Sequence, residues 1–453
     1  MIQLRIARSL EEGRSLLLAQ RGLHQLVVPA GIAKRTLDTF GEALTPSQVV
    51  ERIVSAVRSE GDAALERYSR LIDGAFHRPL QLKTSAIKAA RSRLPAELLS
   101  ALEVAAERIL DFHRKAVRRS WIDPSLQGVF GQLVAPLARV GLYVPGGRAA
   151  YPSSLLMSAL PARAAGVAEV IVATPPSRDG AIPDVVLAAA DIAGVASVYR
   201  IGGAQAIAAM AYGTESIPRV DKIVGPGNIF VALAKRMVSD SAGIDALTGP
   251  TETVIVADEH ARLETVAADL LAQAEHDPLA QPVLLTTAKE LVQRLPGELE
   301  RQLALLPEEN VARESLEGRG VVVLVESLAE AMRLANEYAP EHLCLSVDDP
   351  WSLLDSVRSA GGVFLGEQSA EALGDYVAGP SHVMPTGGTA RFSSPLTVDD
   401  FLKVTSLFAT SPQGLEELGP AAMRIARAEG LDAHAESLRR RLEERQTERP
   451  ERE

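Results

Sequence analysis

The sequence predicts an α/β protein with two tandem, Rossmann-like parallel-sheet units, each incomplete, and small helical extensions at both ends. From about residue 138, short β-rich runs alternate with Ala-rich helical stretches, which is typical of a parallel sheet covered on both faces. The same alternation begins again after residue 251, and this recurrence suggests a duplication. The 453 residues are enough for two such units.

Two helices should precede the first sheet. Apolar periodicity predicts one over about 46–70, after the N-cap signal at Thr45, and another over about 95–118. The strands expected in the first alternating region are 138–144, 168–174, 197–201 and 220–225, and its helices are 153–165, 181–193, 204–212 and 228–240.

The second alternating region should hold five strands and three helices. The expected strands are 252–257, 282–287, 320–325, 342–347 and 362–365, and the helices are 261–275, 288–305 and 327–337. Residues 374–396 are rich in Gly, Pro, Ser and Thr, which indicates a long functional loop. Two further helices, 414–429 and 431–445, are too short to bury much surface alone and should dock elsewhere, with a second subunit as one candidate.

Composition excludes several classes of function. A formal net charge of −11 argues against a nucleic-acid partner. The one cysteine, Cys344, allows no intrachain disulfide and no Cys-rich zinc site, so any metal must be held by His, carboxylate or amide groups. The N-terminus lacks the features of a signal peptide, and no run of about 18 uncharged apolar residues is present. We therefore expect a cytoplasmic protein with no membrane partner.

Three Gly-rich turns follow expected strands, at residues 141–148, 202–205 and 225–228. Glycine lets a backbone approach a ligand closely, and the helix start that follows offers free N–H groups to a phosphate. Three such turns in one unit indicate a nucleotide site. None of them completes the G-x-G-x-x-G pattern, so three tight turns without a ligand are the alternative.

Polar side chains gather at four further places. Gln273 and His276 share a helix face, and Glu341 and His342 start an expected strand, where adjacent side chains can share a site only at the strand's end. The remaining two places are the loop with Asp375 and His382 and the helix break with Glu429 and His434. Metal or proton chemistry is one interpretation of these residues, and ordinary solvated surface positions are the other.

Eight segments in register resemble the histidinol dehydrogenase family over about residues 40–440. They are GLYVPGGRAAYPSS, GGAQAIAA, GPGN, IDALTGPTE, AQAEHD, YAPEHL, GDYVAGPSHVMPTGGTARFSSPLTVDDF and AEGLDAH. Three positions depart from the family pattern, since Thr251 stands where serine is frequent, Thr248 replaces a small alanine and Ser381 replaces an asparagine. These changes concern the fine shape of the substrate pocket.

The resemblance implies a role for individual residues. The implied zinc ligands are Gln273, His276, Asp375 and His434, and the implied proton-handling residues are Glu341 and His342. The implied substrate contacts are Thr251, Gln273, His276, His342, Asp375, His382, Glu429 and His434, and the implied NAD contacts are Tyr143, Gln205 and Asn228.

The activity implied by the resemblance is the NAD-dependent, four-electron oxidation of L-histidinol, through bound L-histidinaldehyde, to L-histidine. It implies one Zn²⁺ per subunit and a homodimer with shared active sites. One alternative is a zinc- and NAD-using enzyme of the same fold acting on another small alcohol, such as a sulfonated diol. Another is a non-catalytic, metal-binding structural protein.

The expected domains follow from the resemblance and the alternating pattern together. They are an N-terminal extension (1–39), a discontinuous α/β domain with the catalytic and metal residues (40–142 and 252–396), a second α/β domain on the NAD side (143–251) and a C-terminal helical tail packed on the partner subunit (397–453).

Overall fold

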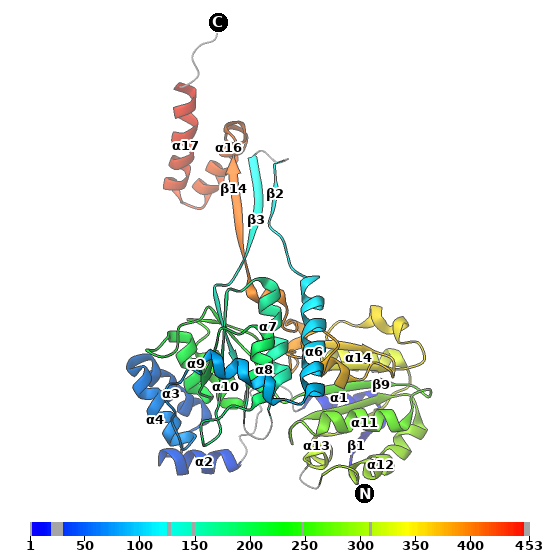
Figure 1. Cartoon of the computed structure of the whole chain (residues 1–453). Coiled ribbons are helices and arrows are strands. Elements are labelled where there is room, and N and C mark those ends of the chain that lie inside the picture. The colour runs from blue at the N-terminus through cyan, green and yellow to red at the C-terminus, as the bar shows by residue number, and fades with distance from the viewer. Residues whose placement is uncertain are drawn as a thin grey trace. The chain divides into compact units, whose positions relative to one another are not determined.

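The computed structural model describes most of the chain, and the remaining residues are drawn as a thin grey trace (Figure 1). The described residues are 2–19, 30–124, 128–146, 150–246, 249–307 and 310–447. They belong to two compact units, of which the larger comprises residues 1–117 and 137–401 and the smaller comprises residues 118–136 and 402–453. None of the described helices is long and apolar enough to cross a membrane.

A six-stranded parallel sheet forms one part of the larger unit. Its strands run in the order β1 (Arg5–Ala7), β11 (Val321–Leu324), β10 (Gln281–Thr286), β9 (Glu252–Ala257), β12 (His342–Ser346), β13 (Gly362–Leu365). Val254 and Val256 pack on one face with α1 (Leu10–Leu18) and α14 (Leu328–Tyr338). Ile255 and Ala257 pack on the other face with α11 (Leu263–Ala274), α12 (Lys289–Leu303) and α13 (Ala312–Arg319). Both faces are covered by helices, which explains the continuous apolar runs in the sequence.

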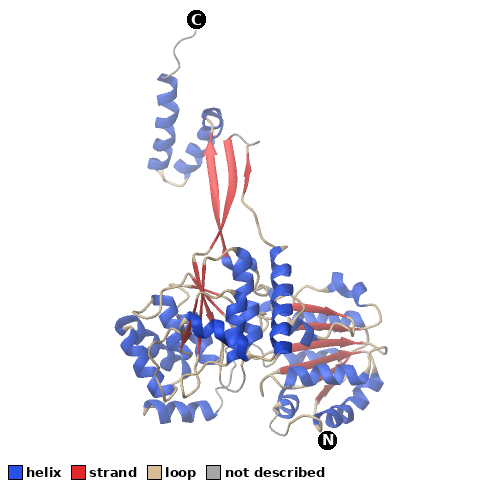
Figure 2. Ribbon diagram, in the orientation of Figure 1, coloured by secondary structure: helices blue, strands red, loops and turns tan. Residues whose placement is uncertain are grey.

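A five-stranded parallel sheet forms the other part of the larger unit. Its order is β6 (Ser197–Arg200), β5 (Glu169–Thr174), β4 (Arg139–Tyr143), β7 (Lys222–Val224), β8 (Gly243–Ile244). The helices of this part include α7 (Pro152–Ala165), α8 (Asp184–Ala193), α9 (Gly203–Tyr212) and α10 (Ile229–Met237). Figure 2 shows both sheets flanked by helices, so the predicted fold class is confirmed.

The two sheets share one strand order. The strands of each alternating region can be numbered 1 to 5 along the chain. Across each sheet they then lie in the order 3-2-1-4-5, and β1 is added to the six-stranded sheet beside its third strand. This is the order of a Rossmann-like sheet, whose direction of winding reverses between the first and fourth strands. The shared order is what a duplication would produce, and it defines two reversal points, β4–β7 and β9–β12.

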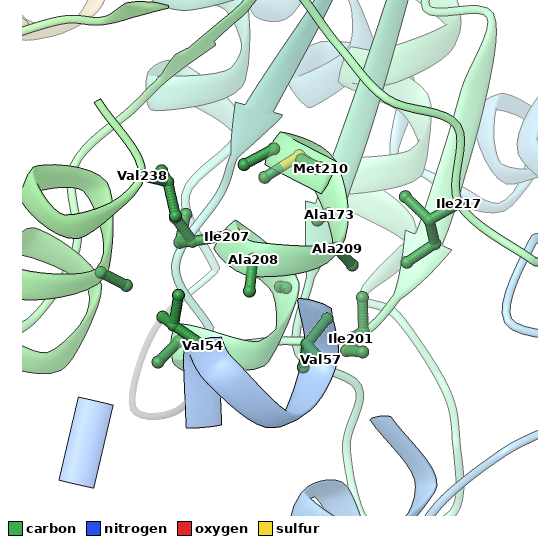
Figure 3. Close-up of a cluster of buried hydrophobic side chains, with 14 of the residues drawn as sticks. Val54, Val57, Ala173, Ile201, Ile207, Ala208, Ala209, Met210, Ile217 and Val238 are labelled. Atoms are coloured by element: carbon green, nitrogen blue, oxygen red, sulfur yellow. The ribbon is translucent and has the colours of Figure 1, made fainter. Parts of the chain in front are cut away.

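One of the early helices packs with the five-stranded sheet. Val54 and Val57 of α3 (Pro46–Glu60) lie in the same buried cluster as Ile207 of α9 and Ile201 after β6 (Figure 3). The domain boundaries expected from the sequence stay a prediction, but this packing joins α3 to the core of the five-stranded sheet.

The prediction of one helix over 46–70 is wrong. The chain forms α3 and then α4 (Asp62–Ile72), because Gly61 between them takes a φ of 57°, which a right-handed helix cannot contain. The helix expected over 95–118 is α6 (Ala96–Arg114). Helices α2 (Ala30–Phe40), α5 (Thr84–Ala90) and α13 are among those that the sequence analysis did not identify.

The smaller unit contains a three-stranded antiparallel sheet. Strand β3 (Gly128–Pro136) pairs with β2 (Trp121–Asp123) and, along its full length, with β14 (Leu402–Thr410). Helices α16 (Pro412–Ala428) and α17 (Asp432–Thr447) follow. The expected tail over 397–453 is therefore not entirely helical: β14 is largely exposed and lacks the apolar run that identified the buried strands.

Candidate active site

The candidate catalytic residues meet at the amino ends of two neighbouring strands. Thr251 immediately precedes β9, Glu341 precedes β12, and His342 is the first residue of β12, in register with Thr253 of β9. Gln273 comes from the last turn of α11. Glu341 and His342 thus lie at the strand end where adjacent residues can face one site.

A hydrogen-bonded chain leads from Gln273 to Glu341. Gln273 Nε2 donates to Thr251 Oγ1 at 2.8 Å, and Thr251 Oγ1 donates to Glu341 Oε2 at 2.6 Å. The backbone N–H of Glu252 donates to the same carboxylate oxygen at 3.1 Å. Burial raises the pKa of Glu341 to about 7, although these donors and His342 oppose the rise. Glu341 therefore exchanges a proton near neutral pH, as a general base must.

The imidazole of His342 is buried among three carboxyl groups. Its Nδ1 lies 3.6 Å from Glu371 Oε1 and 3.9 Å from Glu341 Oε2, and its Nε2 lies 3.9 Å from Asp375 Oδ1. Neither ring nitrogen has a hydrogen-bond partner among the described residues. A buried, unpartnered imidazole is poised for a hydrogen bond to a ligand.

Glu371 is a site residue that the sequence analysis missed. It lies on α15 (Glu371–Tyr376), one helical turn before Asp375, and accepts a hydrogen bond from Thr253 Oγ1 at 2.5 Å. Burial raises its pKa to about 8, so the carboxyl group is mostly protonated at neutral pH. The spacing of four residues from Asp375 could have identified it, since such residues share a helix face.

The loop after α15 brings His382 to the site and joins the two sheets. His382 Nδ1 lies 2.8 Å from the carbonyl oxygen of Asp375, which can only accept, so Nδ1 carries the proton. His382 Nε2 then accepts from Ser154 Oγ, at 3.2 Å, on α7 beside the five-stranded sheet. Burial lowers the pKa of His382. The charge of Asp375 opposes this lowering, whereas His342 and His276 lower the pKa further.

The remaining expected metal and substrate residues are more scattered. His276 is exposed, just beyond the end of α11, and is close enough to influence the pKa of His382. Glu429 and His434 belong to the smaller unit, at the end of α16 and in α17. No group of three or more His, Cys, Asp or Glu residues in the described ranges is arranged to hold a metal ion. The roles assigned to these residues stay predictions.

The expected NAD contacts lie at the carboxyl edge of the five-stranded sheet. Tyr143 ends β4, and its hydroxyl accepts from the N–H of Gly203 at 3.2 Å. Gln205 Nε2 donates to Asp73 Oδ2 at 3.3 Å. Asn228 caps α10, its side-chain oxygen accepting from two backbone N–H groups of the first turn. Gly147, Arg148 and Thr248, which the sequence analysis also singled out, lie outside the described residues.

Comparison with known proteins identifies the family. Residues 41–442 match the family model described as histidinol dehydrogenase. The chain belongs to the histidinol dehydrogenase family. It is 52% identical to the histidinol dehydrogenase of Deinococcus radiodurans over 93% of this chain and 97% of that protein. It is 51% identical to that of Moorella thermoacetica over 87% of this chain and 94% of that protein.

A solved structure agrees with this family assignment. The crystal structure of histidinol dehydrogenase from Elizabethkingia anophelis superposes with a TM-score of 0.89 at 33% sequence identity, covering 98% of each chain. The family resemblance drawn from the eight sequence segments is thus confirmed, and so is the α/β fold.

The buried acid Glu371 should make stability depend on pH. Its pKa is about 8 in the folded chain against 4.5 for a free glutamate, so the folded state binds the proton more tightly. The resulting stabilisation is complete below about pH 4.5 and is lost as the pH rises through about 8. Between about pH 5 and 9, the free energy of unfolding of the wild type should fall by about 4 kcal/mol relative to Glu371→Gln, measured by urea denaturation.

A second carboxylate, Glu298, provides the control. Hydrogen bonds from Arg301 and Gln302 hold the pKa of Glu298 at about 2, so its contribution is lost only as the pH falls below about 4.5. Glu298→Gln should therefore show the same fall in the free energy of unfolding between about pH 5 and 9 as the wild type. If the free energy of unfolding depends on pH in the same way for the wild type and Glu371→Gln, Glu371 is not a buried neutral acid.

Proposed function

We propose that this chain catalyses the NAD-dependent oxidation of L-histidinol, through bound L-histidinaldehyde, to L-histidine. The observation that carries the proposal is the buried Glu341–His342 pair at the β9–β12 reversal point, in a chain about half identical to named histidinol dehydrogenases. The substrate must lose two protons and two hydrides in succession, and NAD, when bound, would accept each hydride. The proposal leaves no role for a sulfonated diol as substrate or for a purely structural metal.

His342 would take the hydroxyl proton of the alcohol. Neither ring nitrogen has a hydrogen-bond partner in the described part of the chain, and the neighbouring carboxylate of Asp375 would stabilise the imidazolium that forms. Because each of the two oxidation steps releases an O–H proton, His342 would act in both.

Glu341 would serve the second step by activating a water molecule that adds to the aldehyde. Its pKa of about 7 leaves a useful fraction ionised at neutral pH while keeping it basic enough to accept a proton. Hydrogen bonds from Thr251 and from the backbone of Glu252 hold one carboxylate oxygen in place, which leaves the other to meet the water.

The proposed metal ligands are Gln273, His276 and Asp375, with His434. Gln273 Oε1 is buried and has no hydrogen-bond partner among the described residues, whereas its Nε2 is fixed by Thr251. An orphaned amide oxygen fits a site that awaits a further group. The nitrogen and oxygen donors favour zinc and also suit manganese or cobalt. A bound zinc ion would orient the amino and imidazole nitrogens of the substrate.

We also propose that the active form is a homodimer with shared active sites. The family resemblance supplies this proposal, because Glu429 and His434 are carried on the C-terminal segment that is expected to pack on the partner subunit. In that arrangement Glu429 of one subunit would contact substrate held by the Gln273, His276 and Asp375 of the other.

Turnover itself tests the activity. The purified protein with L-histidinol and NAD should form two NADH per histidinol consumed, followed at 340 nm, and chelation should abolish this reaction while far-UV circular dichroism stays unchanged. The fold should survive because the two sheets have their own apolar cores. Absence of NADH with metal-replete protein, or NADH from a sulfonated diol instead, would refute the proposal.

Two variants with uncharged polar side chains separate the acid–base roles. His342→Asn should slow both oxidations by about 10²- to 10⁴-fold, because it removes the proton acceptor of each. Glu341→Gln should slow oxidation of the aldehyde far more than oxidation of the alcohol, because only the aldehyde needs an activated water. Single-turnover assays started from each substrate measure this, and equal losses for Glu341→Gln on both would contradict the division of roles.

Subunit mixing tests the shared active site. His342→Ala and His434→Ala are each expected to be inactive, and random exchange makes half of the dimers mixed. If His434 serves the partner's site, each mixed dimer has one intact site, and the mixture recovers about a quarter of wild-type activity. If His434 serves its own subunit, every site keeps one defect. Continued inactivity after exchange has been demonstrated would therefore overturn the shared site.

A further inference from the structure

A buried ion pair lies beside the Gly225–Asn228 turn. Lys235 of α10 and Asp245, which follows β8, are ion-paired, and their side chains are only 2% and 3% exposed. Burial raises the pKa of Asp245 from its ordinary value, and the charge of Lys235 opposes that rise. Neither residue belongs to the proposed catalytic or binding set.

Both members of the pair contact the backbone of Gly225. Asp245 Oδ2 accepts from the N–H of Gly225 at 2.7 Å, and Lys235 Nζ donates to the carbonyl oxygen of the same residue at 3.0 Å. The peptide groups on both sides of Gly225 are thus fixed by charged partners. Gly225 has a φ of 114°, and a Cβ there would come within 2.2 Å of the carbonyl oxygen of Tyr143. The backbone at Gly225 is therefore held on both sides, and the Tyr143 carbonyl leaves no room there for a side chain.

The turn occupies the place where a ligand of this sheet should bind. It follows β7, whose neighbour β4 ends at Tyr143, so it lies at the reversal point of the five-stranded sheet, on the carboxyl edge. Tyr143 also accepts a hydrogen bond from Gly203, which ties the turn after β6 to the same point. A shift at Gly225 would therefore be felt at each of the expected NAD contacts nearby.

Stability alone does not account for the ion pair. Removing two charges from water is costly, and apolar replacements of a buried pair are often as stable as the pair itself. An apolar pair, however, could not form hydrogen bonds with both peptide groups of Gly225.

We propose that Lys235 and Asp245 are positioning residues that hold the Gly225–Asn228 turn in the shape that receives NAD. This inference rests on the proposed function. The pair acts through the backbone of the turn and touches neither substrate nor dinucleotide.

Two neutral double variants separate positioning from stability. Lys235→Met with Asp245→Asn keeps an acceptor for the N–H of Gly225, whereas Lys235→Met with Asp245→Leu removes both contacts, and neither leaves a lone buried charge. By titration calorimetry, the affinity of the Leu double variant for NAD should be lower than that of the wild type by about tenfold or more. The affinity of the Asn double variant should fall by less. The KM for histidinol, and kcat at saturating NAD, should stay within about twofold of the wild type.

The less buried ion pair of Lys222 and Asp400 is the control. Lys222 Nζ and Asp400 Oδ1 are 2.8 Å apart, and Lys222 begins the same strand β7 at the end away from the turn. Lys222→Met with Asp400→Asn should leave NAD affinity unchanged. A control variant that weakens NAD binding as much as the Leu double variant would overturn a specific positioning role.

Hydrogen exchange on the wild type gives a result even where a variant fails to fold. The Gly225 N–H lies outside any helix or strand, yet it should exchange slowly because Asp245 holds it; rapid exchange would overturn the proposal. Wild-type protein that binds no NAD refutes the proposed function, and the inference falls with it. Wild-type protein that binds NAD, with both double variants folded and equal to it in affinity, refutes the positioning role alone.

Discussion

The burial of several carboxyl groups around one imidazole is the constraint on which the candidate active site depends. A carboxylate loses its hydration when it is buried, so burial favours the neutral acid. The pKa values of Glu341 and Glu371 accordingly rise to about 7 and about 8. Both groups can therefore exchange a proton near neutral pH, at 3.9 and 3.6 Å from His342 Nδ1.

The two sheets are alike in strand order but are used at opposite edges. In the five-stranded sheet the expected NAD contact Tyr143 lies at the carboxyl edge of the reversal point, as is usual for α/β proteins. In the six-stranded sheet Thr251, Glu341 and His342 lie at the amino edge of the corresponding reversal point, between β9 and β12. The bond between His382 and Ser154 connects the two sheets at this region. Strand order alone would therefore have placed the candidate catalytic residues on the wrong edge.

Buried, regular elements could be predicted from the sequence, and exposed or irregular ones could not. The strand predicted over 252–257 is β9 without change, because both of its faces are covered and every residue is buried. The strand β14 was missed because its partners come from far away in the chain and most of its residues face solvent. The break at Gly61 was missed because apolar periodicity continues through it. Gly61 shows that periodicity reports burial and cannot report a backbone dihedral angle.

The candidate site was predictable from the family resemblance more than from spacing. Spacing alone could not show that Thr251 joins Gln273 to Glu341, or that Glu371 faces His342, because these contacts link segments far apart in sequence. Asn228 illustrates the opposite case, since its capping of α10 would explain its presence even without a ligand.

Polar groups that have hydrogen-bond partners distinguish the scaffold of this protein from its candidate site, where buried polar atoms lack them. At Gly225 both peptide groups are hydrogen-bonded to charged, buried side chains, so the scaffold itself satisfies this part of the backbone. At the candidate catalytic cluster, Gln273 Oε1 and both nitrogens of His342 are buried without partners in the described part of the chain. Leaving such atoms unpaired costs free energy, and the cost is recovered only when something else binds to them. The rigid turn and the unsatisfied cluster are therefore complementary: one fixes a shape before any ligand arrives, and the other retains the polar atoms that a ligand must complete.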